Sequence, residues 1–475
     1  MKENVNSLKT INSLNKFRNV FFIILSFSFI IAASTLPLVP GLSRSGQVMI
    51  GILLMAAVLW ITEPLPLPIT GILLMITQSF IGIAAPAQIF AAFGNQAVFF
   101  LLGAFIIAAA VKQVGLHKRI AFTFLNFFKN NPKLFTLGIM ISCAILSFFM
   151  PEHGVAALFL PIVTSILISM KLVPKQSNFG KVSMLSVAYG CSIGSLGTLI
   201  GGARNPLTIG ILAEQGISVT FFDWMIYAMP IVIIALPLVW LILQISFPIE
   251  ITDITAARKE IANQLAITGK ITKKEVTTLS VLCVTVILWI FLSSHPQLGL
   301  AGIAILGAIL MVIIGSISWG DIEKNVPWGI ILLYGGAITL SHGMQTTGAG
   351  KWIAHQLLTI VDVNPYLIIL GLIIFTIFLT EVMSNVGAVA LLLPIGLAIS
   401  TEVAEISPLV SSLLIALSGG LAFMLVIATP GNAITYSAGY FSTRDLSKAG
   451  VFANLSCILI IFFIAVFYWT GFLGL

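Results

Sequence analysis

Ionisable side chains occur at two places where the surrounding sequence is strongly apolar. Glu152 and His153 interrupt one apolar run, and Arg204 interrupts the next. A guanidinium binds carboxylate anions through a planar fork of N–H donors, and a carboxylate nearby offsets part of the cost of burying its charge. The pattern predicts either an anion site in which Glu152 compensates Arg204, or an ion pair that only braces the helices. His153 suits a substrate contact, a proton sensor or a hydrogen-bonded core residue.

Two further interruptions of apolar runs are polar but carry no charge. They are Ser384-Asn385-Val386 and Thr429-Pro430-Gly431-Asn432. Half-helices that begin at such breaks present N–H groups to an anion, and carbonyl groups freed there can hold a cation. Peptide groups without partners are tolerated at membrane depth only inside protein or along a water-filled cavity. We therefore expect all of these interruptions to line one cavity.

The composition requires a membrane environment. Of the 475 residues, 59% are hydrophobic and 8% are charged, whereas a soluble domain is about 25% charged. The apolar runs are long enough for a bilayer core about 30 Å thick and predict roughly ten to twelve crossings. The net charge of +7 comes from loop Lys and Arg, which the positive-inside rule explains without a nucleic-acid partner. We expect a multi-pass protein of the plasma (inner) membrane whose N-terminus, with Lys2, Lys9, Lys16 and Arg18, is cytoplasmic.

The sequence contains an internal repeat. At one constant offset, Gly103-Ala104 aligns with Gly336-Ala337, and GVAALFLPI at 154–162 aligns with GAVALLLPI at 387–395. Chance similarity between Leu- and Ala-rich helices is the alternative, but aligned Gly and Pro residues are harder to match by accident. The repeat predicts a transporter fold built from two inverted halves.

Each half contains an apolar segment with a polar break in its middle, which predicts a helical hairpin. The segments span 134–171 and 365–401. The first has basic flanks and should open to the cytoplasm, while the second has mainly acidic flanks and should open to the outside. Ordinary pairs of short spanning helices are the alternative. The flanking charges include Lys112, Lys118, Arg119, Lys129, Lys133, Lys171, Lys175 and Lys181 for the first, and Asp362, Glu402 and Glu405 for the second.

At these residues the chain resembles the divalent anion/sodium symporter family, over nearly its whole length. Members of that family carry a Ser-Asn-Thr triplet at each hairpin tip and a Thr-Pro-Pro-Asn-like or Ser-Pro-Pro-Asn-like turn after it. The second half here keeps Ser384-Asn385, has Val386 in place of Thr, and continues with Thr429-Pro430-Gly431-Asn432. The resemblance implies homodimers, with a scaffold domain and a transport domain that moves like an elevator, and substrates such as succinate, malate, fumarate, 2-oxoglutarate or citrate.

The resemblance implies that Asn385, Thr429 and Pro430 contact substrate and that Ser384, Asn385 and Ala428 lie at a cation site. Other residues at these breaks, in both halves, complete the two expected sets. Those expected to contact substrate are Ser384, Asn385, Val386, Thr429, Pro430, His153, Arg204 and Gly202. A residual cation site, for Na⁺, is expected at Thr380, Ser384, Asn385, Ala428 and Asn432. No other cofactor and no resident metal is expected, because the four cysteines are isolated from one another.

The first half departs from the family pattern. It has Pro151-Glu152-His153 where the triplet should stand, and Gly202-Ala203-Arg204-Asn205 where the turn should stand. Fewer hydroxyl and amide oxygens remain for a sodium ion, while Arg204 supplies a permanent charge. An empty carrier with an uncompensated Arg204 would stall in the membrane. These features predict sodium-independent exchange of dicarboxylates. Sodium- or proton-coupled symport is the alternative, and a channel or an intramembrane enzyme would be a different class; no enzyme motif supports the last.

These inferences combine into an all-α, polytopic inverted-repeat fold with two discontinuous helices. We expect scaffold helices in 1–94 and 276–327, an amphipathic surface linker in 249–275, and repeats in 95–248 and 328–475. Three ionisable residues lie outside the motifs. Glu63 looks like the end of a helix, Glu381 should cap the second hairpin or face an ion path, and His342 resembles a packed core histidine.

Overall fold

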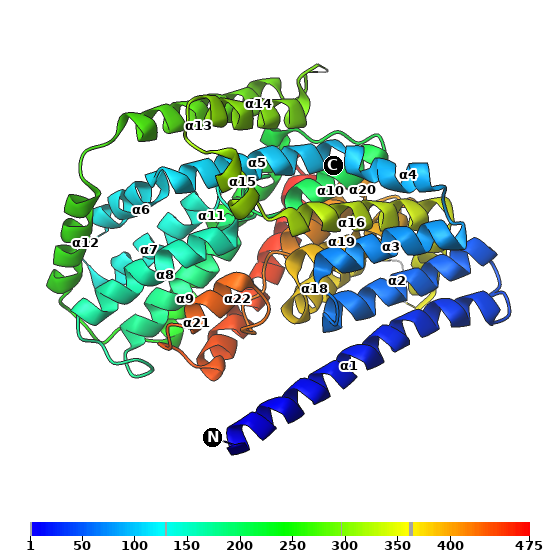
Figure 1. Ribbon diagram of the computed structural model, residues 1–475, viewed down its shortest axis with the longest axis horizontal. Coiled ribbons are helices and arrows are strands. Elements are labelled where there is room, and N and C mark those ends of the chain that lie inside the picture. The colour runs from blue at the N-terminus through cyan, green and yellow to red at the C-terminus, as the bar shows by residue number, and fades with distance from the viewer. Residues whose placement is uncertain (1, 129–130, 296, 361–363) are drawn as a thin grey trace.

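The computed structural model describes residues 2–128, 131–295, 297–360 and 364–475 (Figure 1). Throughout this part of the chain every regular element is helical, which confirms the predicted all-α architecture. Lys129 and Asp362, two of the flanking charges, lie outside the described residues.

The N-terminal helices precede the first repeat. They are α1 (Lys2–Thr35), α2 (Arg44–Thr62), α3 (Leu67–Ile81), the short α4 (Pro86–Phe90) and a 3₁₀ turn, η1 (Ala91–Gly94). Between the repeats lie α12 (Thr255–Thr268), α13 (Lys273–Leu292), α14 (Gly299–Ile313) and α15 (Trp319–Asn325). The predicted surface linker therefore contains one helix, α12, which packs against α6 and α8 of the first repeat.

The two repeats contain the same series of helices. The first consists of α5 (Gln96–Gln113), α6 (Leu116–Phe127), α7 (Pro132–Leu146), α8 (Glu152–Ser169), α9 (Asn178–Gly194), α10 (Arg204–Glu214) and α11 (Phe221–Ser246). The second consists of α16 (Trp328–Thr346), α17 (Ala349–Ile360), α18 (Pro365–Val382), α19 (Asn385–Glu402), α20 (Pro408–Ser418), α21 (Pro430–Tyr436) and α22 (Thr443–Phe463), which continues as a π-helical segment, η2 (Ile464–Thr470).

Glycines at aligned positions bring each repeat close to a helix outside it. A Cβ atom at Gly103 of α5 would lie 2.5 Å from the carbonyl carbon of Ala304 in α14, and one at Gly336 of α16 would collide with Gly71 of α3. Only glycine permits this separation of the helix backbones. The aligned Gly-Ala pairs found in the sequence therefore occupy matching packing positions in the two halves.

The first arms of both hairpins begin with the same cap. Asn131 precedes Pro132 at the start of α7, and Asn364 precedes Pro365 at the start of α18. In both, the Asn side chain accepts backbone N–H groups of the first helical turn. Asn is a preferred N-cap residue, and Pro fits the first turn because its missing N–H would have no partner there. These caps explain why both hairpins begin where they do.

Nine helices among the described residues are long and apolar enough to cross a membrane. This is fewer than the expected ten to twelve crossings because several apolar runs form shorter helices. They are Leu67–Ile81, Pro132–Leu146, Gly299–Ile313 and Pro408–Ser418, and each is shorter than the about 20 residues that a spanning helix needs.

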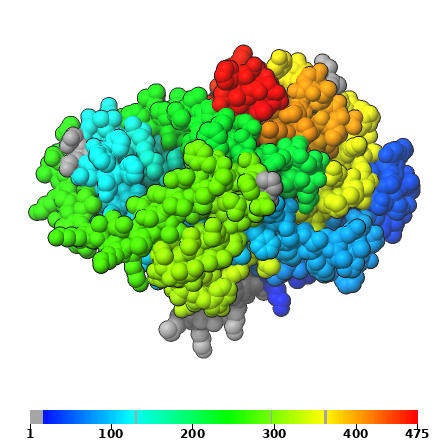
Figure 2. All heavy atoms as spheres, turned by 90° about the horizontal axis from the view of Figure 1, so that it is seen from above, coloured from blue at the N-terminus to red at the C-terminus, as the bar shows by residue number. Residues whose placement is uncertain are grey.

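Large apolar side chains cover the outer surface of this helical assembly. Seen from above, α13 and α14 form an outer layer next to α5 (Figure 2). Phe291 of α13 is 74% exposed and Ile313 of α14 is 71% exposed. Lipid chains can cover such a surface, whereas water cannot solvate it at low cost. The structure therefore agrees with a multi-pass membrane protein.

Candidate functional site

The tips of the two hairpins meet. Glu152 begins α8 and Asn385 begins α19, and the Asn385 Nδ2 donates a hydrogen bond of 3.3 Å to the Glu152 Oε1. The two residues are 233 positions apart, which is the offset of the repeat. Aligned residues of the two halves therefore contact each other where the hairpin tips meet.

A pocket of about 590 Å³ lies at this meeting point. Its wall is formed by both hairpin tips, the unwound segments before α10 and α21, and the end of α2. The structure brings together every residue predicted to contact substrate, namely Ser384, Asn385, Val386, Thr429, Pro430, His153, Arg204 and Gly202. Glu152, Glu63 and Ala428 also line it. Their roles in binding remain predictions.

Arg204 is fully buried and joins the two discontinuous helices. Its Nε donates to the Ala416 carbonyl oxygen of α20 at 3.1 Å, and its Nη2 donates to the Ser195 Oγ at 2.8 Å. Its Nη1 lies 4.0 Å from the Glu152 Oε2. The guanidinium therefore braces the loops and also forms a charge pair beside the pocket, so the two interpretations of the Glu152–Arg204 pair do not exclude each other.

The unwound segments leave room for this guanidinium only because they contain glycine. A Cβ at Gly202 would lie 2.6 Å from the Arg204 Nη1, and a Cβ at Gly420 would overlap the Nη2. Tyr334 of α16 donates a hydrogen bond to the Ala203 carbonyl oxygen next to Arg204. The side chain thus occupies a close-fitting space between both halves.

Part of the predicted cation site is assembled behind the pocket. The Thr380 Oγ1 lies 2.8 Å from the Asn385 Oδ1 and 3.0 Å from the Gly419 carbonyl oxygen, and these two acceptors share its single hydroxyl proton. Hydroxyl, amide and carbonyl oxygens are the ligands that hard cations prefer. Ser384 caps α19 through a bond from the Gly387 N–H, and it lines the pocket with Ala428.

Asn432, the remaining residue of the predicted cation site, holds a loop through its amide nitrogen, and its place at a cation stays a prediction. Its Nδ2 donates to the carbonyl oxygens ten and seven residues earlier, at Ala422 and Leu425. Asn205 in the first half does the same with the carbonyl oxygens ten and seven residues earlier. Both Asn Oδ1 atoms are buried, and neither has a hydrogen-bond partner in the described part of the chain. The structure thus shows a matching role for the two Asn residues that the sequence did not reveal.

Glu381 holds the unwound segment of the second half. Its carboxylate accepts the backbone N–H groups of three successive residues, Phe423, Met424 and Leu425, and the Nδ2 of Asn454 at 2.7 Å. These bonds hold the segment before α21 and not the hairpin that Glu381 was expected to cap; a place on an ion path stays a prediction.

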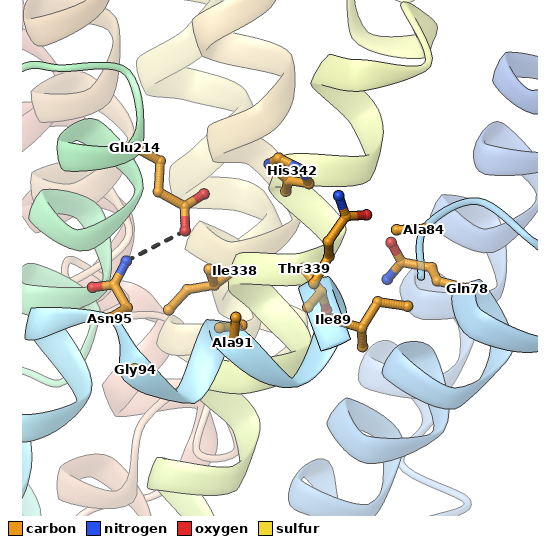
Figure 3. Close-up of a pocket in the computed structure, with 12 residues that line it drawn as sticks. Gln78, Ala84, Ile89, Ala91, Gly94, Asn95, Glu214, Ile338, Thr339 and His342 are labelled. Atoms are coloured by element: carbon orange, nitrogen blue, oxygen red, sulfur yellow. Dashed lines mark hydrogen bonds between the residues drawn. The ribbon is translucent and has the colours of Figure 1, made fainter. Parts of the chain in front are cut away.

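The other two ionisable residues lie at exposed positions. Glu63 ends α2 with φ of 45° and is exposed at the edge of the pocket, in agreement with a helix end. His342 is exposed, so the expectation of a packed core histidine is wrong. It lines a separate pocket of about 540 Å³ in which the Asn95 Nδ2 donates to the Glu214 Oε1 at 3.4 Å (Figure 3). The residues of α16 directly before His342 are buried, whereas His342 itself is exposed. The sequence leading up to His342 is mostly apolar, as in the buried turns, so it does not reveal this difference.

Comparisons with known proteins agree with this architecture. The sequence model of one protein family, the sodium:sulfate symporter transmembrane region, matches residues 16–475. A sodium-dependent dicarboxylate transporter, SdcS, of Staphylococcus saprophyticus is 31% identical over 92% of this chain and 88% of its own. An uncharacterized transporter of Haemophilus influenzae is 30% identical over 96% and 98%.

Two solved structures share the fold at low sequence identity. The YdaH transporter of Alcanivorax borkumensis has a TM-score of 0.58 at 12% identity and covers 80% of this chain and 88% of its own. MtrF of Neisseria gonorrhoeae has a TM-score of 0.59 at 12% identity over 94% of both chains. The family match spans both hairpins, both unwound segments and the pocket between them, and the predicted family relationship is confirmed: this chain belongs to the family of the sodium:sulfate symporter transmembrane region.

Proposed function

We propose that this protein is a secondary carrier that moves dicarboxylates such as succinate or malate together with Na⁺. The observation that carries the proposal is the pocket between the hairpin tips, which combines Arg204, the Asn385 amide and the Thr429 hydroxyl. Such groups bind carboxylates. The oxygens of Thr380, Asn385 and Gly419 lie directly behind and suit a cation that enters with the anion.

The relatives support coupling to sodium rather than sodium-independent exchange. The SdcS proteins of two Staphylococcus species, 30–31% identical to this chain, are named sodium-dependent. The exchange hypothesis depended on an uncompensated Arg204, but Glu152 lies 4.0 Å from its guanidinium. Neither observation supports exchange, so we favour symport, with exchange as the competing outcome. A transporter family also argues against an enzyme or a channel.

We further propose the arrangement that the family resemblance implied. The chain would act as a homodimer in the plasma (inner) membrane, with a cytoplasmic N-terminus. One moving body would consist of the two hairpins together with α9, α10, α20 and α21. Arg204 and Glu381 join these elements through hydrogen bonds. The remaining helices would serve as the scaffold.

Uptake into proteoliposomes tests the proposed function. Purified protein should accumulate labelled succinate in empty vesicles when the outside medium contains Na⁺, and much less when choline replaces it. Entry that requires unlabelled succinate inside, and is equal in Na⁺ and in choline, would favour the exchanger. Absence of any succinate movement would reject both.

Asn385→Ala should weaken succinate binding. The amide nitrogen can donate to a substrate carboxylate, and the amide oxygen can bind the cation. The loss of one hydrogen bond to a charged group costs about 1.5–3 kcal/mol, roughly tenfold or more in affinity. Succinate affinity, measured by scintillation proximity in saturating Na⁺, checks this. Asn325→Ala, which removes an exposed amide outside the pocket, should bind as the parent does. Unchanged affinity in folded Asn385→Ala would remove Asn385 from the site.

Single cysteines should report opposite sidedness for the two hairpins. Leu134, Lys171, Asn364 and Glu402 are all exposed, and Cys283 is the exposed native cysteine, so a Cys283→Ser background is suitable. Positions 134 and 171 should react with an impermeant maleimide from the cytoplasmic side, and positions 364 and 402 from the outside. Labelling of 134 and 171 from opposite sides would contradict the re-entrant hairpin.

A further inference from the structure

Two buried carboxylates of this protein have very different surroundings. Glu381 accepts four N–H groups, as a buried anion requires. Among the described residues, the one hydrogen bond that Glu152 accepts is the 3.3 Å bond from Asn385, and its buried Oε2 has no partner there. Its charge is therefore balanced chiefly by the Arg204 guanidinium at 4.0 Å. Glu152 contributes little to holding the loops, in contrast to Glu381.

The second half has neutral residues at the positions that correspond to Glu152 and Arg204. Asn385 is the residue of the second half that corresponds to Glu152, and Gly431, directly before Asn432, corresponds to Arg204, directly before Asn205. The second half thus forms a tip and a turn with neutral residues in both places. The first half carries a negative and a positive charge in the same two places. The second half therefore shows that a hairpin tip and a turn of this kind can form without either charge.

We propose that Glu152 determines whether the empty carrier can return across the membrane, and so makes this protein a net transporter rather than an exchanger. This inference rests on the proposed function. A symporter completes its cycle only if the site crosses the hydrophobic barrier after its substrate and cations have left. Arg204 cannot be deprotonated and cannot leave. With Glu152 beside it, the Glu152–Arg204 pair carries no net charge, and the crossing is permitted.

The pair also affects the loaded site. Because Glu152 cancels Arg204, the pair brings no net charge to a dicarboxylate with two negative charges. Co-transported cations must therefore supply all of the compensation. Without the carboxylate, Arg204 would compensate one substrate charge, and fewer cations would be needed to load the carrier. Removing Glu152 should thus lower the sodium dependence while it blocks the empty return.

Glu152→Gln tests the proposal in proteoliposomes. The amide keeps the size of the side chain and an oxygen that accepts the Asn385 N–H. We expect the variant to retain exchange of labelled succinate into vesicles preloaded with succinate. Its net uptake into empty vesicles in a Na⁺ gradient should fall at least about tenfold, because the unpaired guanidinium cannot cross. Glu152→Asp keeps the charge and should show a higher ratio of net uptake to exchange than Glu152→Gln.

A double variant provides the decisive control. Glu152→Asn with Arg204→Gly inserts the residues of the second half and removes both charges. Its empty site is neutral, so the ratio of net uptake to exchange should return to the parent's value even if the affinity changes. A role in packing alone would not restore this ratio. The double variant also tests the proposal if Glu152→Gln does not fold.

The outcomes separate this inference from the proposed function. If the parent protein shows no sodium-driven succinate uptake, the proposed function fails and the inference fails with it. If the parent takes up succinate and Glu152→Gln shows the parent's ratio of net uptake to exchange, only the inference is overturned. A folded double variant that exchanges succinate but shows no net uptake overturns it as well.

Discussion

Arg204→Ala is expected to lower the free energy of unfolding by about 3–5 kcal/mol, because breaking a buried pair leaves the other charge uncompensated. The substitution leaves the Glu152 carboxylate buried with the Asn385 bond as its one hydrogen bond within the described residues. It also removes the donors to the Ala416 carbonyl oxygen and the Ser195 Oγ. The transition in detergent, followed by tryptophan fluorescence during denaturant titration, measures the loss.

The double variant Glu152→Asn with Arg204→Gly separates charge from packing. It leaves no unpaired charge, so its free energy of unfolding should fall clearly less than that of Arg204→Ala, although it creates a larger cavity. Equal losses in both variants would show that the guanidinium stabilises the loops by its volume and hydrogen bonds alone. An unchanged transition in Arg204→Ala would contradict the pair as a stabilising element.

Glu381→Ala should lower the free energy of unfolding by about 3 kcal/mol or more. Hydrogen bonds to a charged group contribute about 1.5–3 kcal/mol each, and buried donors without partners are costly. The carboxylate serves three successive backbone N–H groups and the Asn454 amide. Without it the segment before α21 should become mobile. Succinate affinity should also fall, because Thr429 of the predicted site ends that segment.

Two variants control for this effect. Glu381→Gln keeps one acceptor oxygen and should lie between the parent and Glu381→Ala in both unfolding and affinity. Glu405→Ala removes an exposed carboxylate of the same half and should change the unfolding free energy by about 0.5 kcal/mol or less. If Glu381→Ala unfolds like Glu405→Ala, then the loop does not depend on this carboxylate.

Several features of the fold were predictable from short sequence patterns. Asn131-Pro132 and Asn364-Pro365 begin matching helices, because caps depend on neighbouring residues alone. The hairpin breaks were visible because polar residues inside an apolar run cannot face lipid. The repeat offset was predictable as well, since Gly103 and Gly336 are needed wherever two helix backbones come close.

The role of individual polar residues was less predictable. Asn432 was expected at a cation, which stays a prediction, while the loop contacts that its amide nitrogen makes were not foreseen. His342 was expected in the core, but it is exposed beside a pocket. The type of a residue shows which bonds it can make. Which of these bonds form depends on the direction of the side chain and on neighbours from distant segments.

The sequence by itself determined that this is an all-helical membrane protein with two similar halves, because a bilayer permits only structures whose backbone groups bond internally and because repeated Gly, Pro and Asn residues mark equivalent turns. The tertiary structure alone decided which charges meet. Glu152 contacts a residue 233 positions away, Arg204 reaches the carbonyl oxygen of Ala416, and Glu381 binds a loop more than 40 positions further on. Such contacts depend on how the helices pack, and no spacing along the chain specifies them.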